Sequence, residues 1–161
     1  MLEFTPPSHD LPKPDLYREL ANAADAITAG EDDGIANMAN VAALIWQFVP
    51  QLNWAGFYRL IDDELVLGPF IGKPACIRIP LGKGVCGTAA SSGEIQLVED
   101  VNAFAGHITC DPASASELVV PVVVNGSIIA VIDLDSPVAA RFDEHDAAGI
   151  EALANRIASR I

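Results

Sequence analysis

Two apolar segments joined by Asn125-Gly126 place the strongest constraint on how this chain can fold. The segment Leu118 to Val124 (LVVPVVV) precedes the dipeptide, and Ser127 to Asp135 (SIIAVIDLD) follows it. Asn-Gly readily takes positive φ at both central positions of a turn, and this geometry suits a two-residue connection between strands. The sequence therefore predicts a tight antiparallel hairpin, which the rest of the fold has to accommodate.

Apolar residues recur at helical spacing in three other segments, which predicts a helix in each. The first segment follows Asp15, a candidate N-cap, and its pattern ends at Gly30. The second runs from Ile35 to Val49 and is stopped by a proline. The last follows Asp143, another candidate N-cap, close to the end of the chain.

Between these helices, short segments rich in aromatic and β-branched residues predict strands over 54–60, 64–68, 75–79 and 94–99. Residues 82–93 suit a short helix, and 101–117 form an unusually long loop. The order predicts an α+β fold. We expect an antiparallel sheet of about six strands, with the N-terminal helices and the C-terminal helix on one side. This single domain would span 15–161, after a flexible arm over 1–14.

The charge balance limits the partners that the chain can have. Lys and Arg total 9 against 22 Asp and Glu, a net charge of −13, so we expect no nucleic-acid binding. No apolar run approaches the ~20 residues that cross a bilayer, so we expect no membrane span. Residues 1–15 do not resemble a signal peptide, and the cysteine number is odd, at three. A cytoplasmic protein with reduced thiols is therefore expected.

Gly82, Gly84 and Gly87 match the G-x-G-x-x-G pattern of dinucleotide-binding loops. The segment before them contains Arg78 and Pro80 instead of a fully buried apolar strand. The helix after them is also too short for a parallel crossover. A turn that leads into a helix N-terminus is the favoured interpretation.

The three cysteines lie in different contexts, and their spacing matches neither C-x-x-C nor a zinc ribbon. Cys76 falls in a predicted strand, where an inert buried thiol is the simplest interpretation. Cys86 lies near a predicted helix start, which favours a thiolate and makes it the best nucleophile on this argument alone. Cys110 lies in the long loop, a location that suits an exposed, reactive thiol better than a structural one. The neighbouring Asp111 would raise the pKa of Cys110 unless its charge is engaged elsewhere.

His107 lies three residues before Cys110, and three interpretations of it stay open. It could pair with a cysteine nucleophile, or complete a zinc site with Cys76, Cys86 and Cys110. Packing within the loop, with neither of these roles, is the favoured interpretation for this histidine. Whatever the role of His107, the three cysteines lie on segments that could converge, and they are candidates for redox chemistry.

Three carboxylates lie at the open end of the predicted hairpin. If Val124 pairs with Ser127, Glu117 lies near Asp133 and Asp135, which share one face of their strand. Like charges placed so close together are destabilising unless they hold a proton or meet a cation. An ammonium group is the obvious counterpart.

Trp54 and Tyr58, in NWAGFY, are four residues apart and lie on one face of a predicted strand. Aromatic residues in such a position most often belong to the core, and a pocket wall is the alternative.

With these motifs in place, the chain resembles the free methionine-(R)-sulfoxide reductases, a small family built on the GAF domain. The resemblance runs from NWAGFY through KPACIRIPLGKGVCG and GHITCDPASASELVVPV to VIDLDSP and RFDEHD. It implies a GAF-like fold and the thiol-dependent reduction of free L-methionine (R)-sulfoxide. Cys110 would be the attacking thiolate, Cys76 the resolving thiol and Cys86 the third cysteine of the family.

The resemblance also implies how the substrate is held and how the enzyme is recycled. Trp54 and Tyr58 would cradle the substrate methyl group, and Glu117, Asp133 and Asp135 would form the acidic group. Glu117 or Asp135 would serve as the proton donor. We expect no bound cofactor and no metal, with thioredoxin, supplied by NADPH and thioredoxin reductase, as the external reductant. A homodimer through the terminal helices is expected from the fold. A non-catalytic GAF sensor and a structural zinc module are the alternatives.

Overall fold

The computed structural model describes residues 4–5 and 10–161 of the chain. A single six-stranded sheet has the order β3-β2-β1-β6-β5-β4, and every pair of neighbours in it is antiparallel. The helices and strands are α1 (Lys13–Ile27), α2 (Gly34–Phe48), β1 (Trp54–Ile61), β2 (Glu64–Gly72), β3 (Arg78–Pro80), α3 (Gly84–Ser92), β4 (Gln96–Val98), β5 (Ser116–Val124), β6 (Ser127–Ser136) and α4 (Glu144–Ile157). Short 3-10 turns occupy Val101–Ala103 and Ala158–Arg160.

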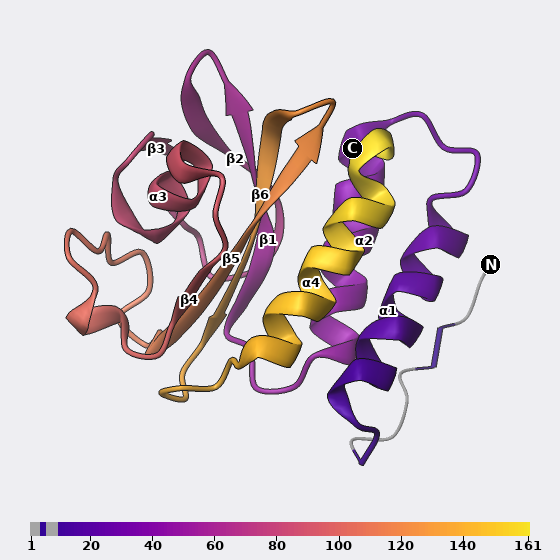
Figure 1. Cartoon of the computed structure of the whole chain (residues 1–161), viewed down its shortest axis with the longest axis horizontal. Helices are drawn as coiled ribbons and strands as arrows, with labels where there is room; N and C mark the ends of the chain where they lie inside the picture. The colour runs from indigo at the N-terminus through magenta and orange to yellow at the C-terminus, as the bar shows by residue number, and fades with distance from the viewer. Residues whose placement is uncertain (1–3, 6–9) are drawn as a thin grey trace.

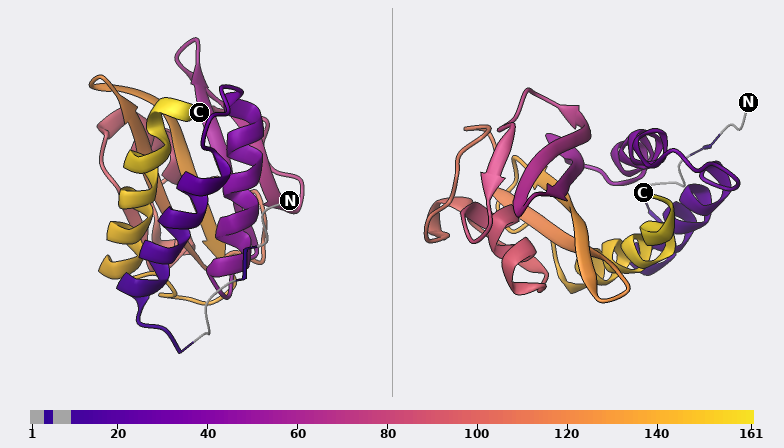
Figure 2. Two further views of the ribbon diagram at one scale, coloured as in Figure 1. Left: turned by 90° about the vertical axis from the view of Figure 1, so that its right-hand side faces the viewer. Right: turned by 90° about the horizontal axis from the view of Figure 1, so that it is seen from above.

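The sheet separates two hydrophobic clusters. Helices α1, α2 and α4 cover one face, and α3 lies with the long loops on the other (Figure 1). The views in Figure 2 show the same layers from the side and from above. The predicted α+β class, the strand number and the placement of the terminal helices are therefore confirmed. None of the helices in the described part of the chain is long and apolar enough to span a bilayer.

Helix α1 begins earlier than the sequence predicts. It starts at Lys13 after Pro12, whereas Asp15 was the predicted N-cap, and this prediction is wrong. Proline presets a helical φ and needs no N–H partner in the first turn, so Pro14 allows the earlier start. Asp15 lies inside the first turn and pairs with Arg18. Of the arm expected over 1–14, residues 1–3 and 6–9 lie outside the described residues.

The hairpin of β5 and β6 forms as predicted, with Asn125 and Gly126 at positive φ. Its register, however, shifts by one residue between Val122 and Val123. A regular ladder from the turn would place Glu117 opposite Leu134, whose side chain packs under the three helices. The shift instead pairs Glu117 with Asp135. Because side chains alternate along a strand, this bulge brings Glu117 to the face of the acidic residues.

Strand β3 is shorter than the sequence predicts. A strand was expected over 75–79, but β3 spans only Arg78–Pro80 and pairs with residues 64–66 of β2. Cys76 therefore lies in the loop before β3, and its predicted place within a strand is wrong. Pro74 cannot donate to a ladder, which favours a loop here. Strand β4 is also shortened, to Gln96–Val98 within the expected 94–99.

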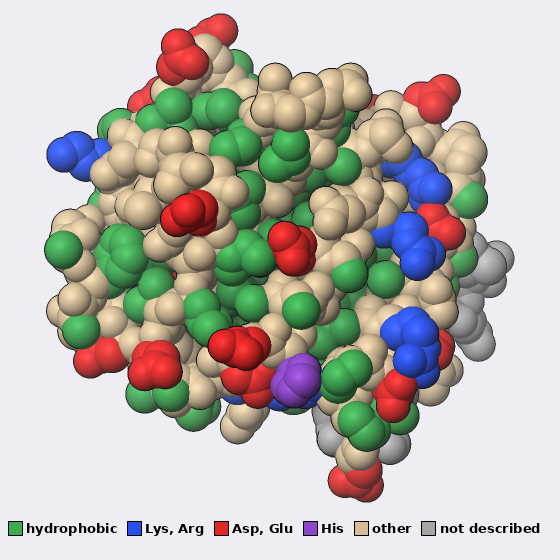
Figure 3. Space-filling view, in the orientation of Figure 1, with side chains coloured by type: hydrophobic (Ala, Val, Ile, Leu, Met, Phe, Trp, Pro, Cys, Tyr) green, Lys and Arg blue, Asp and Glu red, His purple; other side chains and the backbone are tan. Residues whose placement is uncertain are grey.

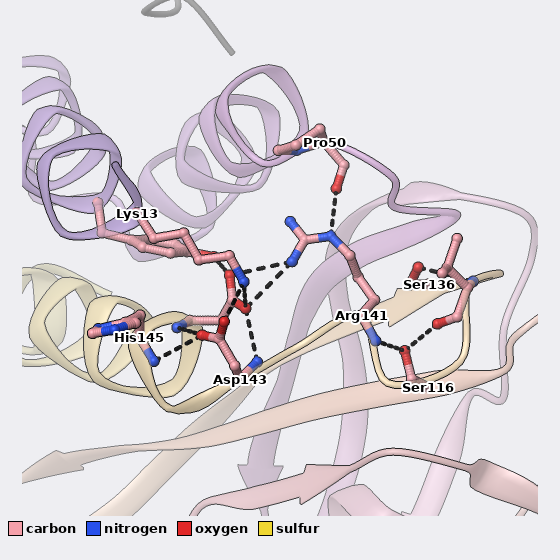
Figure 4. Close-up of polar contacts among 10 residues, drawn as sticks. Lys13, Pro50, Ser116, Ser136, Arg141, Asp143 and His145 are labelled. Carbon is pink, nitrogen blue, oxygen red and sulfur yellow. Dashed lines mark hydrogen bonds and ion pairs between the residues drawn. The ribbon is translucent and has the colours of Figure 1, made fainter. Parts of the chain in front are cut away.

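A buried ion cluster joins α1 to α4 on the helical side of the sheet. The carboxylate of Asp146, which is fully buried, accepts hydrogen bonds from Tyr17 Oη at 2.6 Å and from Lys13 Nζ. Arg141 binds both of its oxygens at 3.3 Å, and Asp143 completes a capping box with it (Figure 4). In the space-filling view, Lys and Arg side chains gather over α1 and α4 (Figure 3).

We predict that Asp146→Ala lowers the free energy of unfolding by about 3 kcal/mol, because it leaves Arg141 buried without its counter-charge. Urea unfolding of the purified protein measures the change. Glu151→Ala, an exposed position on the same helix, should change stability by less than about 0.5 kcal/mol. Equal stability of Asp146→Ala and the parent protein would contradict this account of the cluster.

Candidate active site

A cavity opens on the face of the sheet that lies opposite α1, α2 and α4. Strands β1, β5 and β6, the start of α3 and the loops before β3 and β5 all contribute to its wall. All but one of the predicted site residues line it: Trp54, Tyr58, Cys86, Cys110, Glu117, Asp133 and Asp135. The remaining one, Cys76, is bonded to Cys110. The topology thus brings to one place side chains that are far apart in the sequence.

Cys76 and Cys110 form a disulfide across 34 positions of sequence, with their Cα atoms 5.9 Å apart. The bond ties the loop before β3 to the long loop before β5. Cys86 remains a free, buried thiol. The zinc site considered for Cys76, Cys86, His107 and Cys110 is not assembled here, because two of its four donors are joined as a disulfide.

The environment of Cys86 opposes the thiolate that its position near a helix N-terminus predicts. Complete burial raises the pKa of this thiol well above its ordinary value, and the nearby Asp133 and Glu117 raise it further. The Sγ atom lies 3.9 Å from Glu117 Oε1. Burial beside carboxyl groups thus disfavours Cys86 as the nucleophile, an effect that the helix-end argument did not include.

Asp111, next to Cys110, has its charge engaged by three donors. Its carboxylate accepts hydrogen bonds from the backbone of Ala113 at 2.9 Å, from Asn53 Nδ2 at 3.2 Å and from Lys73 Nζ at 3.2 Å. The Ala113 backbone bond is the main cause that holds the pKa of Asp111 below its usual range. These donors offset the effect that Asp111 would otherwise have on the neighbouring thiol.

The acidic residues form a compact group on one face of two adjacent strands, β5 and β6. Asp135 lies opposite Glu117 on one side and Trp54 on the other. Burial raises the pKa of Glu117 and Asp135 well above the usual range, and the negative charge of Asp133 adds to both shifts. Burial also raises the pKa of Asp133, to about 6. Burial thus favours the protonated forms of Glu117 and Asp135, and a bound cation would favour release of their protons.

One carboxyl oxygen of this group could accept a hydrogen bond from a ligand. Asp133 Oδ1 is buried and has no hydrogen-bond partner among the described residues. A buried carboxylate oxygen without a partner is costly, and a donor that enters the cavity removes that cost. Cys86, Glu117 and Asp133 also offer donor atoms that lie within 4.8 Å of one another, the geometry of a possible metal site. Their raised pKa values disfavour the deprotonated forms that a metal ion needs.

Trp54 and Tyr58 form an aromatic wall of the cavity. Their rings stack with centroids 5.8 Å apart, and Trp54 also stacks on Phe70 at 5.2 Å. Trp54 Nε1 donates to the Lys73 carbonyl at 3.2 Å, and Tyr58 Oη donates to the Cys76 carbonyl at 3.0 Å. The two side chains are therefore buried, as core residues would be, and also line the pocket.

Sequence reasoning missed the contribution of two residues to this site. His107, for which loop packing was the favoured interpretation, lines the cavity with Nε2 3.8 Å from Glu117 Oε2. Burial lowers its pKa, which favours the neutral ring at this position. Lys73 lines the cavity and binds Asp111. The only sequence signals were the positions of these residues three before Cys110 and three before Cys76.

The glycines of the G-x-G-x-x-G pattern have packing roles. A Cβ at Gly87 would lie 2.4 Å from the Pro80 carbonyl oxygen. Gly84 has a φ of +61°, and a Cβ there would come within 3.2 Å of Ile108 in the active-site loop. Together with the wholly antiparallel sheet, these contacts explain the motif as a tight entry into α3.

Comparisons with known proteins agree with this architecture. The GAF domain family matches residues 33–161. The free methionine-R-sulfoxide reductase of Escherichia coli is 50% identical over 141 residues, which cover 88% of this chain and 86% of that protein. The enzyme of the same name from Saccharomyces cerevisiae is 42% identical over 93% of this chain and 88% of its own length.

A solved structure extends the similarity to three dimensions. The free methionine-R-sulfoxide reductase of Neisseria meningitidis, in complex with its substrate, superposes with a TM-score of 0.91 at 42% identity. The match covers 97% of this chain and 94% of that one. Fold and site thus define a GAF domain that carries a disulfide beside an acidic cavity. Within that class, the chain belongs to the family of free methionine-R-sulfoxide reductases.

We predict that the disulfide form exposes almost no reactive thiol until it unfolds, because its one free cysteine, Cys86, is 4% exposed and has a raised pKa. Titration with a chromogenic disulfide reagent at pH 8 should detect about one thiol per chain in denaturant and far less than one in the native state. Rapid reaction of one thiol in the native protein would contradict the described environment of Cys86.

Proposed function

We propose that this chain reduces free L-methionine (R)-sulfoxide to methionine. The observation that carries the proposal is the Cys76–Cys110 disulfide beside a cavity lined by three buried carboxyl groups and two aromatic rings. Such a cavity offers a redox-active sulfur, an anionic pocket and an apolar wall to one small zwitterion. The names of the E. coli, yeast and N. meningitidis relatives support the same activity.

In this proposal the acidic group selects the free amino acid. The substrate ammonium pairs with Glu117, Asp133 and Asp135, and Asp133 Oδ1 gains the donor that it lacks. The methyl group of the sulfoxide packs on Trp54 and Tyr58. A methionine sulfoxide within a peptide has no ammonium on its α-nitrogen, so it would leave these carboxylates without a counter-charge.

The reaction begins when the Cys110 thiolate attacks the sulfoxide sulfur. Glu117 or Asp135, each kept protonated by burial and by neighbouring carboxyl groups, donates a proton to the sulfoxide oxygen. The oxygen passes to Cys110 as a sulfenic acid, and methionine leaves as the reduced product. The Cys76 thiol then attacks the sulfenic sulfur, which releases water and forms the Cys76–Cys110 disulfide.

Another dithiol must then reduce this disulfide. Thioredoxin, itself reduced by NADPH and thioredoxin reductase, is the expected electron donor. Cys86 forms no bond in this sequence of steps, and it packs against the carboxyl groups. A cytoplasmic homodimer, paired through the terminal helices, remains a prediction from the sequence and the fold.

The activity is tested by NADPH oxidation in a mixture of the protein, thioredoxin and thioredoxin reductase after free L-methionine (R)-sulfoxide is added. The parent protein should turn over, and Cys110→Ser should lose at least ~10³-fold in rate, because it lacks the attacking thiolate. Cys76→Ser should form about one methionine per chain and then stall with thioredoxin, because it cannot form the disulfide.

The (S)-sulfoxide and a heat-inactivated sample are the controls for this assay. Turnover by Cys110→Ser at the parent rate would contradict the proposal. Binding of the (R)-sulfoxide without any turnover by the parent protein would favour a GAF sensor instead.

We predict that substrate affinity falls as the pH is lowered below about 6, because protonation of Asp133 then removes charge that pairs with the ammonium. Calorimetric titration of Cys110→Ser with the (R)-sulfoxide measures binding without turnover. Kd should rise by up to about tenfold per pH unit below that point. Asp133→Asn should bind weakly, with little change over the same range. If the Kd of Cys110→Ser, with Asp133 intact, stays constant from pH 7 to 5, this role of Asp133 is contradicted.

A further inference from the structure

The surface around the disulfide differs in charge from the rest of this acidic protein. Residues 65–93 contain no acidic residue, and residues 101–116 contain only Asp111, in a chain that has 22 of them. Asp111 is buried and bound by Lys73. The first segment also carries Lys73, Arg78 and Lys83, all of them exposed. Arg78 pairs with Glu64 at 2.9 Å. The two segments that carry the disulfide thus contribute mainly neutral and positive groups in a molecule of net charge −13.

These two segments supply the two halves of the disulfide. Cys76 belongs to the first segment and is half-buried, and Cys110 belongs to the second and is exposed. Apart from the residues in strands β2 and β3, both segments lie on the side of the sheet away from α1, α2 and α4 (Figure 1). The bond is therefore carried by loops that the large helical layer does not cover.

Ile77, the residue after Cys76, is an apolar contact point on this surface. Its exposed fraction is 70%, the highest among the large hydrophobic residues exposed in the described chain. Its carbonyl accepts a hydrogen bond from Leu67 N at 2.9 Å, which holds its backbone against β2. Pro74 and Pro80, on either side of it in the chain, are exposed as well. Single exposed apolar residues are common, but this one adjoins a bond that another molecule has to open.

We propose that Lys73, Pro74, Ile77, Arg78 and Lys83 form a docking surface for an acidic protein dithiol that reduces the Cys76–Cys110 bond. The net charge of −13 repels an acidic partner, whereas residues 65–93 and 101–116 add no acidic group except Asp111, which Lys73 binds, to the surface around the disulfide. Contact with Ile77 excludes water beside Cys76. The physiological use of this surface rests on the proposed function, whereas the disulfide and the charge pattern are features of the structure itself.

The reduction is a thiol–disulfide exchange in two steps. A thiolate of the partner bonds to one sulfur of the pair, and the bond between Cys76 and Cys110 breaks, so the other sulfur leaves as a thiolate. The second thiol of the partner then attacks the mixed disulfide. The partner ends as a disulfide. Its two protons and two electrons have converted Cys76 and Cys110 to thiols.

The test follows one round of disulfide opening with no methionine sulfoxide present, so it does not depend on the proposed activity. Reduced thioredoxin and dithiothreitol are each mixed with the oxidised protein, and the second-order rate constant of thiol release is measured. Ile77→Glu should lower the constant for thioredoxin by at least about tenfold, because it places an acid on the docking surface. The constant for dithiothreitol should change by less than about twofold, because a small dithiol needs no docking.

Ile35→Glu is the matched control. Ile35 is also exposed, at 47%, but it lies in α2 on the helical side of the sheet. This variant should react with both reductants as the parent does. The proposal is overturned if Ile77→Glu reacts with thioredoxin at the parent rate. It is also overturned if its reactions with thioredoxin and dithiothreitol slow equally, or if Ile35→Glu slows as much. Failure of the proposed function would instead appear as normal disulfide opening without methionine sulfoxide turnover.

Discussion

Three carboxyl groups buried on one face of a sheet are the constraint on which this structure depends. Burial raises the pKa of Glu117, Asp133 and Asp135, and the negative charge of Asp133 raises the pKa of the other two further. A protein tolerates such a group only if it shares protons or receives a cation. In the proposed reaction, the same conflict that would destabilise an ordinary core provides both a proton source and a site for an ammonium ion.

The rest of the fold holds this group in place. On the far side of the sheet, a hydrophobic cluster under α1, α2 and α4 fixes the strands. At the ends of β5 and β6, Ser116 Oγ donates to the Val138 carbonyl at 2.7 Å, and Ser136 Oγ accepts from Val138 N at 3.1 Å. These serines adjoin Glu117 and Asp135 in sequence. Arg141 connects the same region to Asp146 and Pro50, so the helical layer is tied to the strand ends that carry the acids.

Local rules predicted most of the elements, because their signals lie within a few residues. Asn125-Gly126 specified the hairpin, and Asp143 specified the start of α4. The bulge that turns Glu117 toward Asp135 has no comparable signal, since it depends on how two strands settle against both layers. Likewise, the state of Cys86 depends on burial beside Asp133, and the pairing of Asp111 depends on Lys73 from a distant loop. Such effects arise from tertiary contacts that single-sequence patterns do not contain.

The proposed activity depends on recognition of the free α-ammonium of a small zwitterion by the acidic group. The most direct test compares the kcat/KM for free L-methionine (R)-sulfoxide with that for its N-acetyl derivative, which keeps the sulfoxide but carries no ammonium charge. We expect a loss of at least ~10³-fold for the N-acetyl compound, because it leaves buried carboxylates unpaired. Comparable kcat/KM values for the two compounds would contradict the account.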